Sequence, residues 1–316
     1  MYKILVTGGA GFIGNHLVKA LLNDPLAYVV IMDNMSSIDF SRLPDKNIPN
    51  WEFIKGNANK YEDIKSVFQQ HSFEYIFHYA AFVGVEQNLK QPVSVFEDLK
   101  GIEYLLQFSI KHQVKRFIYA SSSEVYGNSP SFPQYEDSTP LNARLPYGAV
   151  KATGEAFVRA YQQQFGLPYS IFRFFNVYGS TQRHDFVMQK FLSAALKGEN
   201  LYIYGDGQQK RTFCFIDDAT QTVINAYRNP EAENLIMNVG NSKEYTILQL
   251  AQYIQKVTGA KSSIIHKDRI RKEEIFRRLP DNSRMKRFLQ RPLTSLEEGI
   301  KKMIPSSVYK STLLPK

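Results

Sequence analysis

The chain has 316 residues, a hydrophobic fraction of 43% and a formal net charge of +9. This length holds one large domain or two small ones, and the apolar content is ordinary for a globular protein. The basic residues are spread out except from Lys267 to Arg291, where acidic residues are mixed in, so a solvated helical face is favoured over a nucleic-acid surface. The basic balance also suits an anionic small-molecule substrate.

Cysteine usage and hydropathy limit the cellular setting. Cys214 is the only cysteine, which excludes an internal disulfide and fits a reducing compartment. No stretch is long enough to span a membrane, and the N-terminus enters a glycine-rich turn without room for a signal peptide. We therefore expect a cytoplasmic protein that contacts neither a membrane nor nucleic acid.

The sequence begins with a predicted strand, a glycine-rich turn and a helix. Tyr2–Thr7 is a short apolar strand, and Gly8, Gly11 and Gly14 follow at the spacing G-x-x-G-x-x-G. Apolar residues at helical spacing come next, namely Phe12, Ile13, Leu17, Val18, Leu21 and Leu22. Glycines in such a turn permit a tight bend, approach to a pyrophosphate and close helix–strand packing. The helix start offers unpaired N–H groups to phosphates, which indicates a dinucleotide site.

A second predicted strand, Tyr28–Met32, ends at Asp33. A carboxylate at this position of a dinucleotide-binding unit hydrogen-bonds the adenosine ribose. Asp33 would repel a ribose 2′-phosphate, and no arginine follows it directly. The sequence therefore favours NAD over NADP as the cofactor.

Strands and helices continue to alternate along the chain. Strands are predicted at Trp51–Ile54, Glu74–His78, Arg116–Ser121 and Tyr169–Phe174, and helices at Tyr61–Gln70, Val93–Lys111 and Tyr147–Phe165. This alternation implies an α/β fold, with a Rossmann-type doubly wound parallel sheet over residues 1–176. From about Val177 the rhythm changes, and residues 177–316 are predicted to form a smaller α/β substrate-binding region that interleaves with the first. Ligands are expected at the carboxyl ends of the strands.

One constellation of residues indicates proton-transfer chemistry. Tyr147 and Lys151 have the spacing Y-x-x-x-K, which puts a phenol and an ammonium on one helix face. A nearby cation stabilises a phenolate and lowers the pKa of the tyrosine, which gives a base near neutral pH. Ser122, Ser123 and Glu124 follow the end of an earlier strand. An incidental surface pair is the alternative, and the dinucleotide turn disfavours it.

Six motifs carry a resemblance to a known family. They are T-G-G-A-G-F-I-G at Thr7–Gly14, H-Y-A-A at His78–Ala81, S-S-S-E-V-Y-G at Ser121–Gly127, Y-G-A-V-K at Tyr147–Lys151, F-N-V-Y-G at Phe175–Gly179 and Y-G-D-G at Tyr204–Gly207. Together they resemble the extended short-chain dehydrogenase/reductases that act on nucleotide sugars, the NAD-dependent epimerase/dehydratase group. The resemblance covers nearly the whole chain and implies bound NAD and transient oxidation of a sugar at C4.

The resemblance implies a role for each residue of the reacting site. Tyr147 is expected to take the proton of the sugar 4-hydroxyl while hydride passes from C4 to NAD. Lys151 is expected to tune Tyr147 and to hold the nicotinamide ribose. Ser122 matches the family's Ser/Thr that hydrogen-bonds the sugar O4.

Contacts to the substrate and the cofactor are implied by position as well. Asn176 matches a residue that contacts the nucleotide sugar, and Arg211 and Arg278 match arginines kept for its diphosphate. The positions expected to contact NAD are Gly8, Gly11, Phe12, Ile13, Gly14, Asp33, Asn34, Asn57, Ala58, Ala80, Ala81, Tyr147 and Lys151. No metal site is expected, since His78 has no partner ligands at zinc spacing and is predicted to pack near the cofactor.

Some positions depart from the family pattern. Asn57 stands where many members have Asp near the adenine. An amide still accepts a hydrogen bond, so this departure bears on the affinity for the dinucleotide and not on the function. Ser180 and Thr181 replace a common Pro-Arg pair after V-Y-G. Because of this second departure, the resemblance does not assign the substrate contacts of this loop.

Glu124 and Ser123 bear on the step that follows C4 oxidation. In the family, 4,6-dehydratases and UDP-glucuronate decarboxylases carry Glu at the position of Glu124, whereas many 4-epimerases carry a small or hydroxyl residue there. Glucose-type dehydratases place an acid at the position of Ser123, and serine is a poor acid. GDP-mannose dehydratases share the S-E pair but usually use NADP. This pair, with Arg277–Asp281, favours a UDP-glucuronate decarboxylase. The alternatives are a 4-epimerase, a 4,6-dehydratase and a catalytically silent NAD-binding protein.

The helices Val93–Lys111 and Tyr147–Phe165 carry apolar residues on more than one face. Examples on the first helix are Leu99, Leu105, Leu106 and Phe108. The resemblance implies that the two helices pair with those of a second subunit, in a four-helix bundle that forms a homodimer. The alternative is that these residues complete the core of the monomer.

Overall fold

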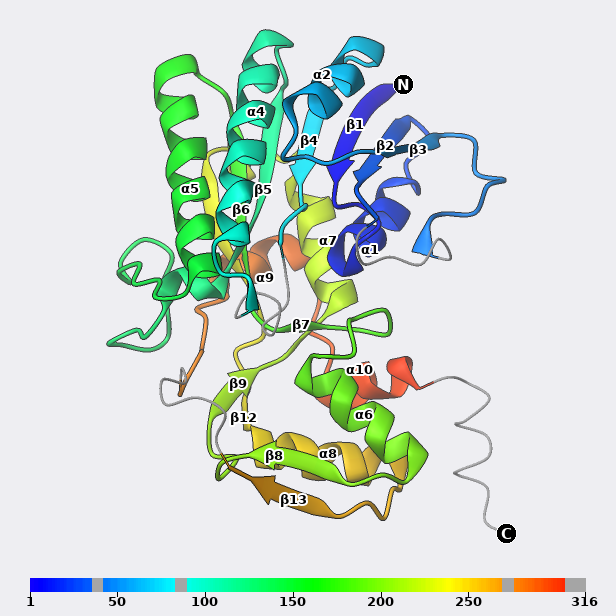
Figure 1. Cartoon of the computed structure of the whole chain (residues 1–316), viewed down its shortest axis with the longest axis vertical. Coiled ribbons are helices and arrows are strands. Elements are labelled where there is room, and N and C mark those ends of the chain that lie inside the picture. Colours follow the sequence, from blue (N-terminus) through cyan, green and yellow to red (C-terminus); the bar gives the residue numbers. More distant parts are fainter. Residues whose placement is uncertain (36–41, 83–89, 269–275, 305–316) are drawn as a thin grey trace.

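Seven parallel strands form the centre of the molecule. The computed structural model describes residues 1–35, 42–82, 90–268 and 276–304. The sheet order is β11-β6-β5-β4-β1-β2-β3 (Figure 1). The strands are β1 (Tyr2–Thr7), β2 (Ala27–Asp33), β3 (Trp51–Lys55), β4 (Tyr75–His78), β5 (Arg116–Ser122), β6 (Tyr169–Phe174) and β11 (Leu235–Val239). The order runs outward from β1 in both directions, which confirms the doubly wound α/β fold.

Helices cover both faces of this sheet. One face carries α2 (Tyr61–Gln70), α4 (Asp98–Lys111) and α5 (Pro146–Phe165), and the other carries α1 (Phe12–Leu21), α7 (Ile216–Ala226) and α9 (Ser283–Leu289). In β1, Ile4 and Val6 pack into the core on the α1 side, and Leu5 packs into the core on the α4 side. Successive residues of a strand point to opposite faces, so a strand that is buried on both faces needs this uninterrupted apolar run.

The helix predicted over Val93–Lys111 is divided in the structure. A 3₁₀ turn, η2 (Ser94–Glu97), precedes α4, which begins at Asp98. The buried Asp98 carboxylate accepts hydrogen bonds from the Phe82 backbone N–H at 2.7 Å and from the Asn59 side-chain amide at 2.9 Å. These contacts anchor the chain at the point where the tighter turn gives way to regular helix. The other predicted elements agree with the structure to within one residue at each end.

The chain after Val177 forms a smaller region, drawn in the lower part of Figure 1. Its elements are β7 (Val177–Tyr178), α6 (Val187–Lys197), β8 (Leu201–Tyr204), β9 (Lys210–Thr212), β10 (Cys214–Phe215), β12 (Glu244–Thr246), α8 (Ile247–Thr258), β13 (Ile264–Lys267) and α10 (Leu296–Met303). The same stretch returns to the main sheet, where β11 pairs with β6 and α7 packs on α1. In the described ranges, each helix is too short or too polar to cross a membrane.

Three of the four apolar residues singled out on α4 belong to the protein's own core. Leu105 and Leu106 are fully buried and Phe108 is 6% exposed, all within the cluster between the sheet and its helices. Leu99 is partly buried against the same cluster. The three buried side chains therefore complete the core of the monomer and carry no argument for a second subunit.

Candidate functional site at the carboxyl edge of the sheet

The turn after β1 has no room for side chains at two of its glycines. Gly8 has a φ of 69°, and a Cβ there would lie 2.5 Å from the Ala80 backbone nitrogen. A Cβ at Gly14 would lie 2.2 Å from the Gly8 carbonyl oxygen, whereas at Gly11 the nearest atom would be 3.1 Å away. The first and third glycines thus let the turn pack tightly, and at the second a Cβ would crowd the Gly8 carbonyl oxygen less severely.

The start of α1 and Asp33 face this turn. In the described chain, no side chain caps α1 at Gly11 and no acidic residue lies in its first turn, so the N–H groups around Phe12 and Ile13 are available to a phosphate. The Asp33 carboxylate accepts hydrogen bonds from the backbone N–H groups of Ala10 at 3.3 Å and of Asn34. Burial raises the pKa of Asp33. This pairing of a glycine cradle with a carboxylate fits a bound dinucleotide.

The remaining residues predicted to contact NAD come from the neighbouring strand ends. Asn57 follows β3, and its side-chain oxygen accepts a hydrogen bond from the Asn59 N–H at 2.9 Å. Ala58 is 6% exposed. Ala80 and Ala81 follow β4, and the Ala80 N–H donates to the Thr7 hydroxyl at 3.4 Å. Their strands flank β1 and β2, so the topology brings them to the glycine turn.

His78 is a buried packing residue. Its Nδ1 lies 2.8 Å from the Thr7 hydroxyl oxygen, and its ring stacks on Tyr119. Burial, helped by the charge of Lys151, lowers the pKa of His78 to about 3, so the ring is neutral near pH 7. Among the described residues, no three His, Cys, Asp or Glu side chains gather as metal ligands do.

Tyr147 and Lys151 project from the first two turns of α5. Lys151 Nζ donates to the Ala120 carbonyl oxygen at 2.7 Å and lies 5.7 Å from the centre of the Tyr147 ring. Burial lowers the pKa of Lys151 to about 8, although the charges of Asp98 and Glu155 oppose this shift. Lys151 therefore stands beside the phenol, as the spacing predicts.

The pKa of Tyr147 moves in the direction opposite to the expectation. Burial raises it well above its ordinary value, and the negative charge of Glu124 adds to the rise. A hydrogen bond with Ser122 and the charge of Arg278 lower it by less. The expected net lowering of the Tyr147 pKa is wrong in sign, because removing a phenolate from water outweighs the attraction of nearby cations.

Arg278 lies against the motif that follows β5. It is 5% exposed; its Nη1 donates to the Ser123 hydroxyl at 2.7 Å, and its Nη2 lies 2.6 Å from a Glu124 carboxylate oxygen. Its charge also acts on Tyr147. The structure thus brings Ser123, Glu124 and Arg278 together near Tyr147. Sequence reasoning missed this contact, because it placed Arg278 with the diphosphate.

Asn176 follows β6 of the main sheet, and Arg211 lies on β9 of the smaller region. Asn176 has a φ of 40°, and its side-chain nitrogen is buried without a hydrogen-bond partner among the described residues. Such a group calls for an explanation, and a substrate contact supplies one. Arg211 donates from Nη1 to the carbonyl oxygens of Lys210 at 2.8 Å and Phe276 at 3.2 Å. Their contacts with substrate stay predictions.

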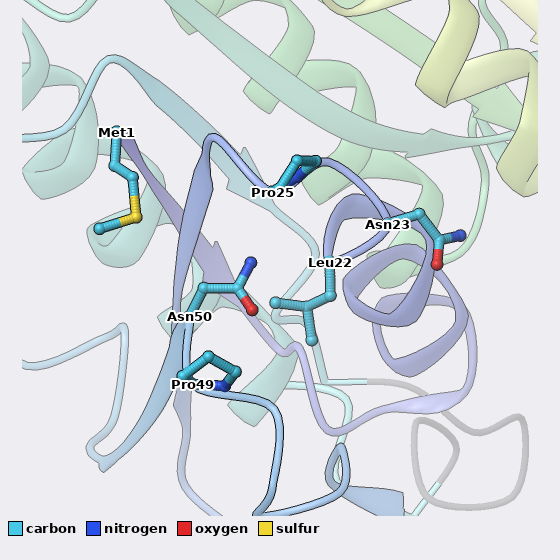
Figure 2. Close-up of a pocket in the computed structure, with 6 residues that line it drawn as sticks. All are labelled: Met1, Leu22, Asn23, Pro25, Pro49 and Asn50. Carbon is cyan, nitrogen blue, oxygen red and sulfur yellow. The ribbon is translucent and has the colours of Figure 1, made fainter.

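A surface pocket elsewhere holds none of the predicted site residues. Figure 2 shows it lined by Met1, Leu22, Asn23, Pro25, Pro49 and Asn50. These residues precede β1, β2 and β3, so the pocket lies at the amino ends of the strands. The glycine turn and Tyr147 belong to the opposite, carboxyl edge, where ligands of such sheets bind.

Comparison with known proteins identifies the family. The model of the NAD dependent epimerase/dehydratase family matches residues 4–240. A Bacillus subtilis protein named as an uncharacterized UDP-glucose epimerase is 33% identical over 97% of this chain and 99% of its own length. A UDP-N-acetyl-alpha-D-glucosaminuronate decarboxylase from Bacillus cytotoxicus is 33% identical over 96% of both chains. The crystal structure of a Thermotoga maritima UDP-glucose 4-epimerase with UDP-glucose has a TM-score of 0.89 and 31% identity over 99% of this chain and 100% of that one. The chain therefore belongs to the NAD-dependent epimerase/dehydratase family and is an enzyme with NAD as its cofactor.

Proposed function

We propose that this enzyme decarboxylates UDP-glucuronate after transient oxidation of the sugar at C4. The observation that carries the proposal is the buried Arg278 guanidinium near Tyr147, held by Ser123 and Glu124. A cation there suits a substrate with a carboxylate next to the reacting carbons. The Bacillus cytotoxicus relative, named as a decarboxylase of a UDP-linked uronate, supports the same choice.

Oxidation at C4 needs a base for the hydroxyl proton and an acceptor for the hydride. The glycine turn and Asp33 would hold NAD, which would supply a reversible acceptor for that hydride. Tyr147 Oη accepts the proton of the 4-hydroxyl, and the Ser122 hydroxyl, which hydrogen-bonds Tyr147, orients the two reacting oxygens. Lys151 places a positive charge beside the phenol and stabilises its ionised form.

The step after oxidation uses the carboxylate of the uronate. A ketone at C4 makes the C6 carboxylate that of a β-keto acid. The C5–C6 bond breaks, its electron pair passes into the C4 carbonyl as an enolate, and C6 leaves as carbon dioxide. C5 then takes one proton, which comes from solvent. Arg278 binds and orients the carboxylate before it leaves, and Glu124 holds the guanidinium in place.

A 4-epimerase is the second candidate, because the named relatives and neighbours include UDP-glucose epimerases. A solved Bacillus cereus UDP-glucuronic acid 4-epimerase, 28% identical, binds UDP-glucuronic acid and NAD, so a uronate substrate does not by itself decide the reaction. Inversion at C4 gives Arg278 and Glu124 no direct task. A 4,6-dehydratase needs an acid for the leaving 6-hydroxyl, and the Ser123 hydroxyl is a poor one.

The test compares the masses of the products. The protein is incubated with NAD and, separately, with UDP-glucuronate, UDP-glucose, UDP-N-acetylglucosamine and GDP-mannose. We expect UDP-glucuronate to lose the mass of carbon dioxide, with no loss in a parallel incubation with Tyr147→Phe. Loss of water would indicate a dehydratase, and unchanged mass with a shifted chromatographic peak would indicate an epimerase. Either of these results contradicts the decarboxylase.

We further propose that the enzyme works as a homodimer in the cytoplasm. Cys214 is buried and unpaired, which fits a reducing compartment. On α4 and α5, Leu99, Tyr104 and Tyr161 are partly buried, and Phe165 is half-exposed. A second copy packed on these helices would cover them. Sedimentation at micromolar concentration is expected to give a dimer, and monomer alone would contradict it.

A further inference from the structure

Three polar residues lie in register across neighbouring strands of the sheet. Ser121 of β5 pairs with Arg173 of β6, and Arg173 pairs with Asn238 of β11. Side chains of directly paired residues project to the same face of a sheet. All three residues are at most 3% exposed. They form a buried polar layer beside the end of the site that holds Tyr147 and Arg278, which we call the reaction end. The chemistry proposed above gives this layer no role.

The layer joins α5 to the sheet through an ion pair. Arg173 Nε and Nη2 donate to the two Glu155 carboxylate oxygens at 2.8 Å and 2.6 Å, and Ser121 Oγ donates to the same carboxylate at 2.5 Å. Glu155 is fully buried and lies one helical turn beyond Lys151 and two beyond Tyr147. The ion pair therefore anchors the helix that carries the reacting tyrosine.

Tyr126 connects this ion pair to Asn238. Its hydroxyl oxygen accepts a hydrogen bond from Arg173 Nη1 at 2.7 Å and donates to Asn238 Oδ1 at 2.8 Å. Burial raises the pKa of Tyr126 to about 12, so the phenol remains a neutral donor near pH 7. One oxygen atom thus joins the half of the layer on α5 to the half on β11.

Asn238 in turn holds the segment that contains Arg278. Its side-chain nitrogen donates to the backbone carbonyl oxygens of Gln134 at 2.9 Å and Asp281 at 3.2 Å. The Gln134 N–H donates to the Leu279 carbonyl at 2.7 Å, and the Asp281 N–H donates to the Gln134 carbonyl at 2.9 Å. The backbone immediately after Arg278 is therefore fixed on both sides by the layer.

We propose that Asn238 is a positioning residue for the step after C4 oxidation, because it fixes the Arg278 guanidinium relative to Tyr147. A buried network with every member paired has one arrangement, since a displaced member leaves a polar group unpaired in the core. A misplacement of about 1 Å in a reacting group costs about 100-fold in rate. The inference rests on the role proposed for Arg278 at the reaction end.

Asn238→Asp tests this role with a change of almost no volume. The variant keeps the acceptor for Tyr126 and replaces the amide donor by an oxygen that repels two carbonyl oxygens. In a single turnover, NADH absorbance rises with C4 oxidation and falls when the hydride returns. We expect the rise to change less than about threefold and the fall to slow about tenfold. The control is Asn225→Asp on α7, whose amide donates to the Phe288 carbonyl at 2.7 Å, and both phases should match the wild type.

Two outcomes would overturn the proposal: equal slowing of both phases in Asn238→Asp, or a change in neither. If thermal melting shows that this variant does not fold, Tyr126→Phe takes its place, because it removes only the connecting oxygen; the same selective slowing is expected with a smaller factor. The trace is recorded with whichever of the four nucleotide sugars the wild type converts. An unchanged mass of UDP-glucuronate thus contradicts the proposed reaction, whereas an unselective trace contradicts the role of Asn238.

Discussion

The two ends of the candidate site present different kinds of groups to a ligand. At the dinucleotide end, Gly8, Gly14 and the start of α1 present backbone groups, and the Asp33 carboxylate faces the turn. At the reaction end, the partly buried Tyr147 and the buried Arg278 present side chains from segments that are far apart in the chain. The dinucleotide end is therefore suited to binding a cofactor, and the reaction end is suited to proton transfer and to holding a charged group of the substrate.

This difference predicts that substitutions at the two ends have separable effects. Changes at the dinucleotide end alter the affinity and choice of cofactor, because backbone shape and one carboxylate determine both. Changes at the reaction end alter the rates of chemical steps, because the base and the cation there act on the sugar. Variants that mix the two effects would break the comparison.

The largest expected effect is at the reaction end. Tyr147→Phe removes the proton acceptor for the 4-hydroxyl, so turnover should fall by about 10²–10⁴-fold. Bound NAD should remain at the wild-type level, because we expect the cofactor to rest mainly on the glycine turn and Asp33. Product formation and extracted dinucleotide measure the two quantities. Tyr202→Phe, at a tyrosine that is 44% exposed on β8, is the control. Near-normal activity in Tyr147→Phe would contradict the assignment of Tyr147 as the base.

A second variant separates the steps within the reaction end. Glu124→Gln loses the charge that pairs with Arg278 at 2.6 Å, so the guanidinium is held less firmly. We expect the step after C4 oxidation to slow by about 10-fold or more, and C4 oxidation itself to slow less. Enzyme-bound NADH should then accumulate during turnover, which absorbance detects. Glu231→Gln, which breaks an exposed pair with Arg287, is the matched control. Slower oxidation without accumulated NADH would contradict the assignment.

The dinucleotide end could be predicted from the sequence because its parts are contiguous. The strand, the three glycines, the helix and Asp33 lie within the first 33 residues, and each has a local signal in glycine spacing or apolar periodicity. The parallel sheet follows from the same alternation of elements. Tyr147 and Lys151 are predictable for the same reason, since they lie one helical turn apart.

The rest of the reaction end depends on contacts across the fold. Arg278 meets Ser123 across 155 positions of sequence, after the chain has returned through β11 to the sheet. No local pattern encodes that contact. The direction of the Tyr147 pKa depends on burial, which spacing alone does not give. The start of α4 at Asp98 likewise depends on Phe82 and Asn59, which belong to other elements.

The pKa values of Tyr147 and Lys151 predict how C4 oxidation at the reaction end depends on pH. Burial raises the pKa of Tyr147, so the deprotonated base is the minor form at neutral pH and its fraction rises tenfold per pH unit. The rate should therefore rise from about pH 6 toward about pH 8. Above the Lys151 pKa of about 8 the neighbouring cation is lost, and the rate should level off. Single-turnover NADH formation measures the profile, and a rate that falls between pH 6 and 8 would contradict the assigned base.

The smallest expected effect is at the dinucleotide end. The Asp33 carboxylate accepts a hydrogen bond from the Ala10 N–H in the glycine turn, where we expect it to accept hydrogen bonds from a ribose and to repel a ribose 2′-phosphate. Asp33→Ala should weaken the binding of NAD, and the ratio of affinities for NAD over NADP should shrink by about 10-fold. Titration of both dinucleotides measures the ratio of dissociation constants. Asp45→Ala, at an exposed carboxylate before β3, should leave the ratio unchanged. With NAD saturating, the C4-oxidation rate of Asp33→Ala should stay within about threefold of the wild type. Equal wild-type affinity for the two dinucleotides would contradict the assigned preference, and a large fall in that rate would show that the two ends are not separable.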